Sequence, residues 1–165
     1  MALTQQFARV TPEHLERLRT GAEEWEPGAE NLLDTGWAVW GLIRFCRASG
    51  ADPGTVALLD RAVSGDPDGD IGFLDHDGVY DGFTDPPRLL TPTAVADIAR
   101  GLDALDPGAL LADLPDSPDA ASAVCGFGPW SDGDVRAHLL EHLSAMREFY
   151  REAAIHGQCV VTWID

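Results

Sequence analysis

The fold is decided by residues 135–164, VRAHLLEHLSAMREFYREAAIHGQCVVTWI. The first part of this stretch repeats apolar residues with a period of about 3.6, which predicts an amphipathic helix of about five turns. The repeating residues are Val135, Leu139, Leu143, Met146, Tyr150 and Ala153. Ser131 or Asp132 is expected to cap the start of the helix, and Gly157 stands where a glycine commonly ends one. The β-forming residues 159–164 predict a C-terminal strand.

Two other segments share one layout, a short apolar strand, a Thr-Pro pair and a helix. Their helices begin at Thr11-Pro12 and Thr91-Pro92. Threonine is a favourable N-cap and proline suits the first helical position, so both pairs predict a helix start. The C-terminal strand must pair with these earlier strands. We therefore predict an α+β fold, a single compact domain over residues 1–165, with several helices packed on a small sheet that includes the N-terminal and C-terminal strands.

Between these segments, residues 35–48 predict a helix that Asp34 caps and that is apolar on nearly every side. We expect it to be largely buried, with Trp37 and Trp40 in the core. A second helix is predicted over residues 55–63. Residues 64–87 are rich in aspartate and glycine and predict a long irregular loop with a short strand at 71–74. The composition of 106–129 predicts a further connection, with a weak helical pattern at 109–114.

Four of these motifs, taken in order, resemble the YfbM-like family, a bacterial family of unknown function. They are the opening strand with its Thr-Pro helix, LDTGWAVWGL at 33–42, PRLLTP at 87–92, and FYREAA at 149–154 followed by Gly157 and the apolar strand. The resemblance covers nearly the whole chain. It implies a small cytoplasmic α+β domain, and it supplies no activity and no catalytic residues.

The net charge of the chain limits the classes of partner that it is expected to bind. The 165 residues hold 28 Asp and Glu against 11 basic residues, all arginine, for a formal net charge of −17. Nucleic acids and anionic membranes bind clustered positive charge, so the composition argues against both. A basic protein or a cation would be attracted instead. The three widely spaced cysteines, the absence of a signal-like N-terminus and the absence of a long apolar run predict a cytoplasmic protein.

One motif has the spacing of a zinc site. His138, Glu141 and His142 read H-x-x-E-H, which on a helix places two imidazoles four residues apart with a carboxylate near them. A zinc-dependent hydrolase is therefore one alternative. The helix is already explained by its apolar stripe, however, and the spacing indicates no third ligand. We expect histidines at the boundary of the core and predict that they bind no zinc.

The aspartate-rich segment 66–85 offers a second alternative, a small-ligand or divalent-cation binder. Asp66, Asp68 and Asp70 alternate as in a calcium loop, and Asp77 stands at the twelfth position. Ile71 stands at the sixth position, where a calcium loop needs glycine, and Asp77 is shorter than the usual glutamate. Ordinary aspartate turns explain the pattern more simply.

Other motifs are weaker still. GFGPW at 126–130 lacks the third glycine of a dinucleotide loop, and Pro129 removes a backbone donor. Cys46 and Cys159 lie in apolar runs, which favours inert thiols. We therefore expect no catalytic residue and no cofactor. The leading hypothesis is a non-enzymatic interaction protein or inhibitor of the immunity type, whose acidic surface takes a basic partner protein. The sequence leaves its oligomeric state open.

Overall fold

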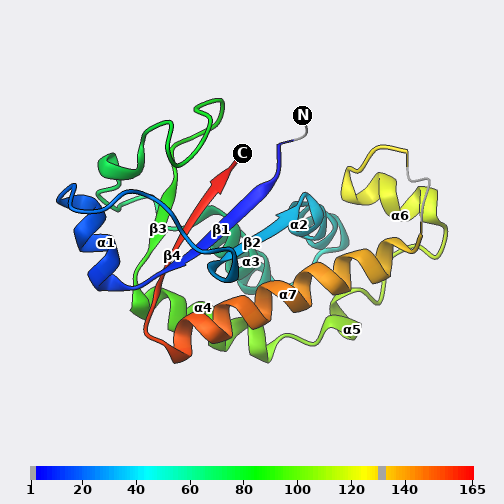
Figure 1. Cartoon of the computed structure of the whole chain (residues 1–165). Helices are drawn as coiled ribbons and strands as arrows, with labels where there is room; N and C mark the ends of the chain where they lie inside the picture. The colour runs from blue at the N-terminus through cyan, green and yellow to red at the C-terminus, as the bar shows by residue number, and fades with distance from the viewer. Residues whose placement is uncertain (1–2, 130–132) are drawn as a thin grey trace.

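Within the residues that the structure describes, four strands pair into one antiparallel sheet in the order β2-β1-β4-β3 (Figure 1). The computed structural model describes residues 3–129 and 133–165. Its elements are β1 (Gln5–Val10), α1 (Pro12–Arg19), η1 (Ala29–Asn31), β2 (Leu32–Gly36), α2 (Ala38–Ser49), α3 (Pro53–Ser64), η2 (Gly72–Leu74), β3 (Arg88–Leu90), α4 (Pro92–Ala104), α5 (Pro107–Leu110), α6 (Pro118–Cys125), α7 (Val135–Ile155) and β4 (Cys159–Ile164). The first and last strands pair along their whole length, from Gln5 opposite Ile164 to Val10 opposite Cys159. The predicted α+β fold with both terminal strands in its sheet is confirmed.

The two faces of the sheet carry separate apolar clusters, because successive side chains of a strand point to opposite sides. Phe7, Leu90 and Val160 face the larger cluster, which α2, α3, α4, α6 and α7 cover. Val10 and Val161 face the smaller cluster, which contains α1 and the segment 71–80. The two predicted Thr-Pro helices therefore lie on opposite faces of one sheet.

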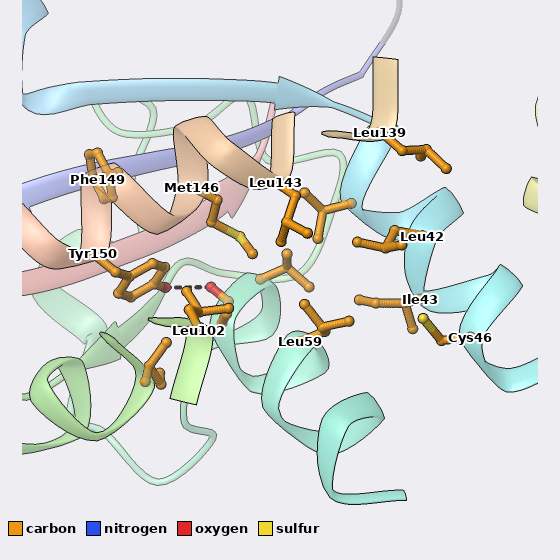
Figure 2. Close-up of a cluster of buried hydrophobic side chains, with 14 of the residues drawn as sticks. Leu42, Ile43, Cys46, Leu59, Leu102, Leu139, Leu143, Met146, Phe149 and Tyr150 are labelled. Atoms are coloured by element: carbon orange, nitrogen blue, oxygen red, sulfur yellow. Dashed lines mark hydrogen bonds between the residues drawn. The ribbon is translucent and has the colours of Figure 1, made fainter. Parts of the chain in front are cut away.

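The larger cluster forms the core, and α7 runs along it (Figure 2). Every residue of the predicted α7 stripe is buried. Leu139, Leu143 and Met146 meet side chains of α2 and α3, and the Tyr150 hydroxyl donates a hydrogen bond to the Ala62 carbonyl. Burial raises the pKa of Tyr150 well above its usual range, so this donor keeps its proton. None of the helices within the described ranges is long and apolar enough to cross a membrane.

The helix starts follow the predicted chemistry in α1 and α4. The Thr11 hydroxyl accepts a hydrogen bond from the His14 amide at 3.1 Å, and the Thr91 hydroxyl accepts one from the Ala94 amide at 3.3 Å. At α7 the structure differs from the prediction. Ser131 and Asp132 lie outside the described residues, and Asp134 is the N-cap, accepting from the Arg136 amide at 2.9 Å.

The predicted start of the helix over residues 35–48 is wrong. Residues 32–36 form strand β2, and α2 begins at Ala38, directly after Trp37. The Asp34 carboxylate accepts from the Gly36 amide at 2.7 Å, which turns the chain two residues before the helix. Trp37 therefore lies at the entrance of α2 with 42% of its surface exposed, not in the core. Trp40 is half-buried.

Two smaller predictions are also corrected. The strand expected at residues 71–74 is the 3-10 turn η2, held by a hydrogen bond from the Leu74 amide to the Ile71 carbonyl at 2.8 Å. Leu74 is buried against the smaller cluster, so these apolar residues pack without joining the sheet. Within the predicted connection 106–129, helix α6 forms and packs against α2 and α7.

Candidate functional site

A cleft of about 460 Å³ opens on the α1 face of the sheet. One wall is the loop that follows α1, and the other is η2 with the residues after it. Its apolar surface comes from Leu18, Trp25, Phe73 and Leu74, and its carboxylates come from Glu23, Glu24 and Glu26. We call this the acidic cleft. Apolar and aromatic walls with a few polar groups are typical of binding sites.

Aromatic contacts hold both walls. Trp25 packs edge-on against Trp163 of β4, with ring centroids 5.8 Å apart and an interplanar angle of 82°. On the other wall, the Arg19 guanidinium carbon lies 4.6 Å from the Phe73 ring centroid, a cation–π distance. The Arg19 guanidinium also lies 3.2 Å from an Asp70 carboxylate oxygen. Contacts with neighbouring side chains therefore orient both Trp25 and Phe73.

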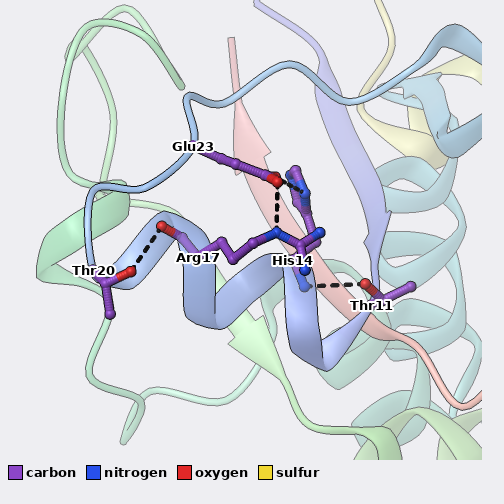
Figure 3. A network of polar contacts seen from close by, with 5 residues as sticks. All are labelled: Thr11, His14, Arg17, Thr20 and Glu23. Carbon is purple, nitrogen blue, oxygen red and sulfur yellow. Dashed lines mark hydrogen bonds and ion pairs between the residues drawn. The ribbon is translucent and has the colours of Figure 1, made fainter.

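One of the three glutamates, Glu23, is paired with other side chains of the chain. The Glu23 carboxylate lies 2.5 Å from Arg17 Nε and 2.5 Å from His14 Nδ1 (Figure 3). Glu24 and Glu26 are exposed, and neither has a hydrogen-bond or ion-pair partner among the described residues. Two carboxylates beside two aromatic rings therefore have no counter-charge from the described part of the chain.

A second hydrogen bond shapes the far wall. The Tyr80 hydroxyl donates to an Asp75 carboxylate oxygen at 2.6 Å, which closes the turn that follows η2. This bond, assisted by burial, raises the pKa of Tyr80 to about 12. The Gly78 amide donates to His76 Nδ1 at 3.1 Å within the same turn. Tyr80 thus remains a donor over the physiological pH range, and the wall that carries Phe73 is held in place.

The four aspartates of the calcium-like pattern do not converge. Asp66 forms a two-pronged ion pair with Arg61, with both nitrogen–oxygen distances 2.8 Å, and this bond lowers its pKa. Asp70 pairs with Arg19, whereas Asp68 and Asp77 are exposed. No group of three or more His, Cys, Asp or Glu side chains within residues 3–129 and 133–165 has the arrangement to hold a metal ion.

The H-x-x-E-H residues lie on the outer part of α7. His138 and His142 are half-buried, and Glu141 is exposed. The two imidazoles pack edge to face with centroids 4.6 Å apart, and His138 also packs against Phe127 at 6.0 Å. Burial, and then the neighbouring His142, lowers the pKa of His138. The rings therefore pack on one another and on an aromatic at the predicted core boundary.

The remaining sequence candidates serve packing. Burial raises the pKa of Cys46, Cys125 and Cys159 to about 11, so each thiol is protonated at neutral pH and is a poor nucleophile. In the glycine-rich segment, the Phe127 ring covers Gly41 of α2 so closely that a Cβ there would lie 2.3 Å from it. Trp130, in the same segment, lies outside the described residues.

Sequence reasoning does not identify Trp25, Phe73, Glu24 or Glu26 as site residues. One signal is present, because EEWE, residues 23–26, places a large aromatic side chain among three carboxylates. No sequence signal brings Phe73 to it, since that contact depends on how the 64–87 segment folds back over the sheet.

This α+β domain belongs to a protein family of unknown function. The chain matches the model of the domain of unknown function DUF1877 over residues 1–163, and it is therefore a member of that family. Its structure is similar to that of YfbM from Escherichia coli, a protein of unknown function, with a TM-score of 0.58 and 16% sequence identity over 98% of this chain and 99% of that chain. That likeness shows a shared fold. No curated protein matches the chain.

Proposed function

We propose that the protein is a non-catalytic interaction protein of the inhibitor or immunity type, and that its acidic cleft takes a basic segment of a partner protein. The observation that carries this proposal is the position of Glu24 and Glu26, which have no counter-charge within the described ranges, beside the aromatic walls Trp25 and Phe73. An arginine side chain offers both a cation for the carboxylates and a flat face for an aromatic ring.

The charge of the whole chain supports the same proposal. A net charge of −17 raises the encounter rate with a basic partner, whereas close contacts decide which surface is bound. The alternatives have weaker support. A cation at Asp66 and Asp70 would have to displace Arg61 and Arg19. For a zinc ion at His138 and His142, the described residues bring no third His, Cys, Asp or Glu ligand into place.

The test uses the peptide acetyl-Arg-Phe-Arg-amide and the full chain. Binding is followed by ¹H–¹⁵N NMR at about 50 mM salt, where surface charges are only weakly screened, with the Trp25 indole N–H as the local reporter. Exposed ion pairs contribute roughly 0.2–1 kcal/mol each, so a Glu24→Gln/Glu26→Gln variant is expected to bind about fivefold more weakly.

The matched control removes two exposed carboxylates elsewhere, Asp113→Asn/Asp116→Asn, and leaves the net charge equal to that of the first variant. The control is expected to stay within about twofold of the wild type, since exposed charges outside the cleft act only through the screened field. Equal weakening by both double variants would mean that the peptide responds only to net charge, and the acidic cleft would lose its proposed role. Failure of the peptide to perturb Trp25 would have the same consequence.

A further inference from the structure

A second cleft, of about 330 Å³, lies on the opposite face of the sheet. It opens where β3 and the end of β4 meet α2 and the last turn of α3. Arg88, Trp40, Thr162 and Ser64 line it, with Asp85 and Pro86 on the loop that leads into β3. We call this the Arg88 cleft. Its volume lies within the usual range of small-molecule sites.

The Arg88 side chain has no hydrogen-bond or ion-pair partner among residues 3–129 and 133–165. Most arginines of the chain bond to a carboxylate or a backbone carbonyl, and within the described ranges only Arg44 and Arg88 have neither. Arg44 is exposed to water, whereas Arg88 is half-buried and lines a cleft. Among the half-buried arginines of the described ranges, Arg88 alone has a guanidinium that bonds to neither a carboxylate nor a backbone carbonyl.

A carboxylate close to Arg88 in the fold is held by another cation. Asp66 bridges to Leu89, the neighbour of Arg88 on β3. Both of its oxygens accept from Arg61, at 2.8 Å each. Because both Asp66 oxygens already bond to Arg61, Asp66 does not neutralise the positive charge of Arg88 at the cleft.

Hydrogen bonds fix the walls of the cleft. The Trp40 indole N–H donates to the Gln5 side-chain oxygen at 3.0 Å, and the Gln5 amide nitrogen donates to the Trp163 carbonyl at 3.0 Å. Gln5 is 1% exposed, so a buried amide fixes the tryptophan ring. The Thr84 hydroxyl donates to the Ile164 carbonyl at 2.9 Å and ties the entry loop to β4.

Glycine at position 65 makes the close packing behind Arg88 possible. Its φ is 69°, and a Cβ there would lie 2.8 Å from the Arg88 Cβ and 3.2 Å from the Thr162 hydroxyl oxygen. Only glycine adopts this backbone conformation readily. The stem of Arg88 is therefore packed beside the end of α3, and its position is set by the backbone around it.

We propose that the Arg88 cleft binds a small organic carboxylate with an apolar body. Arg88 takes the carboxylate, because a guanidinium matches a carboxylate in two parallel hydrogen bonds. The fixed Trp40 ring and the side chain of Val63 take the apolar part, and the hydroxyls of Ser64 and Thr162 offer further donors. This site is separate from the acidic cleft, since the two clefts lie on opposite faces of the sheet. Of the two, the Arg88 cleft alone is lined by an arginine, with the Asp85 carboxylate on its entry loop.

The probes are 3-phenylpropionate and its neutral analogue 3-phenylpropanamide, added to the ¹⁵N-labelled full chain. The acid is expected to shift the Trp40 indole N–H and the Thr162 and Ile164 amides. The neutral analogue is expected to bind about tenfold more weakly, because it lacks the charge that a guanidinium pairs with. Equal binding of the two probes, or no shift at Trp40 at millimolar acid, would overturn the proposal without any variant.

Arg88→Gln is expected to abolish the preference for the acid, and Arg88→Lys is expected to retain part of it. Arg44→Gln, which removes the other arginine without a partner in the described ranges, is the matched control and is expected to bind like the wild type. A preference that survives Arg88→Gln, or that is lost equally in Arg44→Gln, would contradict the assignment to Arg88.

Discussion

The two clefts of this molecule differ in how the chain uses its own charges. Beneath the acidic cleft, His14 and Arg17 pair with Glu23, but Glu24 has no counter-charge among the described residues. Beside the Arg88 cleft, Arg61 pairs with Asp66, and Arg88 forms no ion pair with any described residue. At each cleft one ion pair stabilises the wall. A neighbouring charged side chain, Glu24 in one cleft and Arg88 in the other, forms no ion pair with the described residues. The difference in sign teaches that net charge alone does not describe what this protein can bind.

The largest expected difference between the two clefts is the loss of stability when a glycine at each cleft is replaced by alanine. Gly65→Ala places a Cβ against Arg88 and Thr162 in a backbone region that suits only glycine, with φ 69° and ψ −175°, and we expect a loss of about 3 kcal/mol. Gly21, at the acidic cleft, has φ 75° and no atom within 4 Å of where a Cβ would stand, so Gly21→Ala is expected to cost only about 1 kcal/mol. Urea melts of both variants provide the comparison. Similar losses would show that the packing behind Arg88 is loose.

The next largest loss of stability is expected when the tyrosines Tyr150 and Tyr80 are replaced by phenylalanine. Tyr150→Phe leaves the buried Ala62 carbonyl without its donor, and we expect a loss of about 2 kcal/mol in the free energy of unfolding. Tyr80→Phe removes only the bond to the exposed Asp75 and is expected to cost less, while it loosens the wall that carries Phe73. The same denaturant melts rank the two variants, and the reverse order would be incompatible with the burial described above.

A smaller effect depends on pH. Arg61 lowers the pKa of Asp66 in the folded state, so the pair stabilises the protein above the unfolded-state pKa and loses this contribution as the pH falls through the folded pKa. Because both side chains are partly exposed, Asp66→Asn is expected to cost roughly 0.5–1 kcal/mol at neutral pH. The difference between variant and wild type should shrink below about pH 4. Melting curves from neutral to acidic pH measure it, and a constant difference would contradict the role of the ion pair.

The smallest effect expected is that of salt. A net charge of −17 makes the folded chain repel itself, and the Debye length falls to about 10 Å at 0.1 M salt. The melting temperature should therefore rise by a few degrees as sodium chloride is added. Glu24→Gln/Glu26→Gln should reduce this rise, and a melting temperature that falls with salt would show that attractive pairs outweigh the repulsion.

Periodicity and capping make much of the fold predictable. The α7 stripe and the two Thr-Pro starts are local signals, and the structure follows all three. Strand β2 is hidden in the sequence because Asp34 looks like a helix cap, whereas its carboxylate turns the chain at Gly36. The prediction that Trp37 is buried is wrong for the same reason, since the helix begins three residues after Thr35, its expected first residue.

The candidate sites are harder to predict than the fold. Sequence spacing favours His138, Glu141 and His142 and the aspartates of 66–77, which are close to one another along the chain. Trp25 and Phe73, or Trp40 and Arg88, are brought together only by the way distant segments cover the two faces of the sheet. A long loop such as 64–87 has no periodicity from which its path can be inferred.

The most direct test of two clefts with opposite charge preference is one NMR experiment in which both probes are added to the same labelled sample. We expect acetyl-Arg-Phe-Arg-amide to shift the Trp25 indole N–H and leave that of Trp40 unchanged. We expect 3-phenylpropionate to do the reverse, and each probe to bind equally well in the presence of the other. Both probes shifting the same indole, or each displacing the other, would contradict the account.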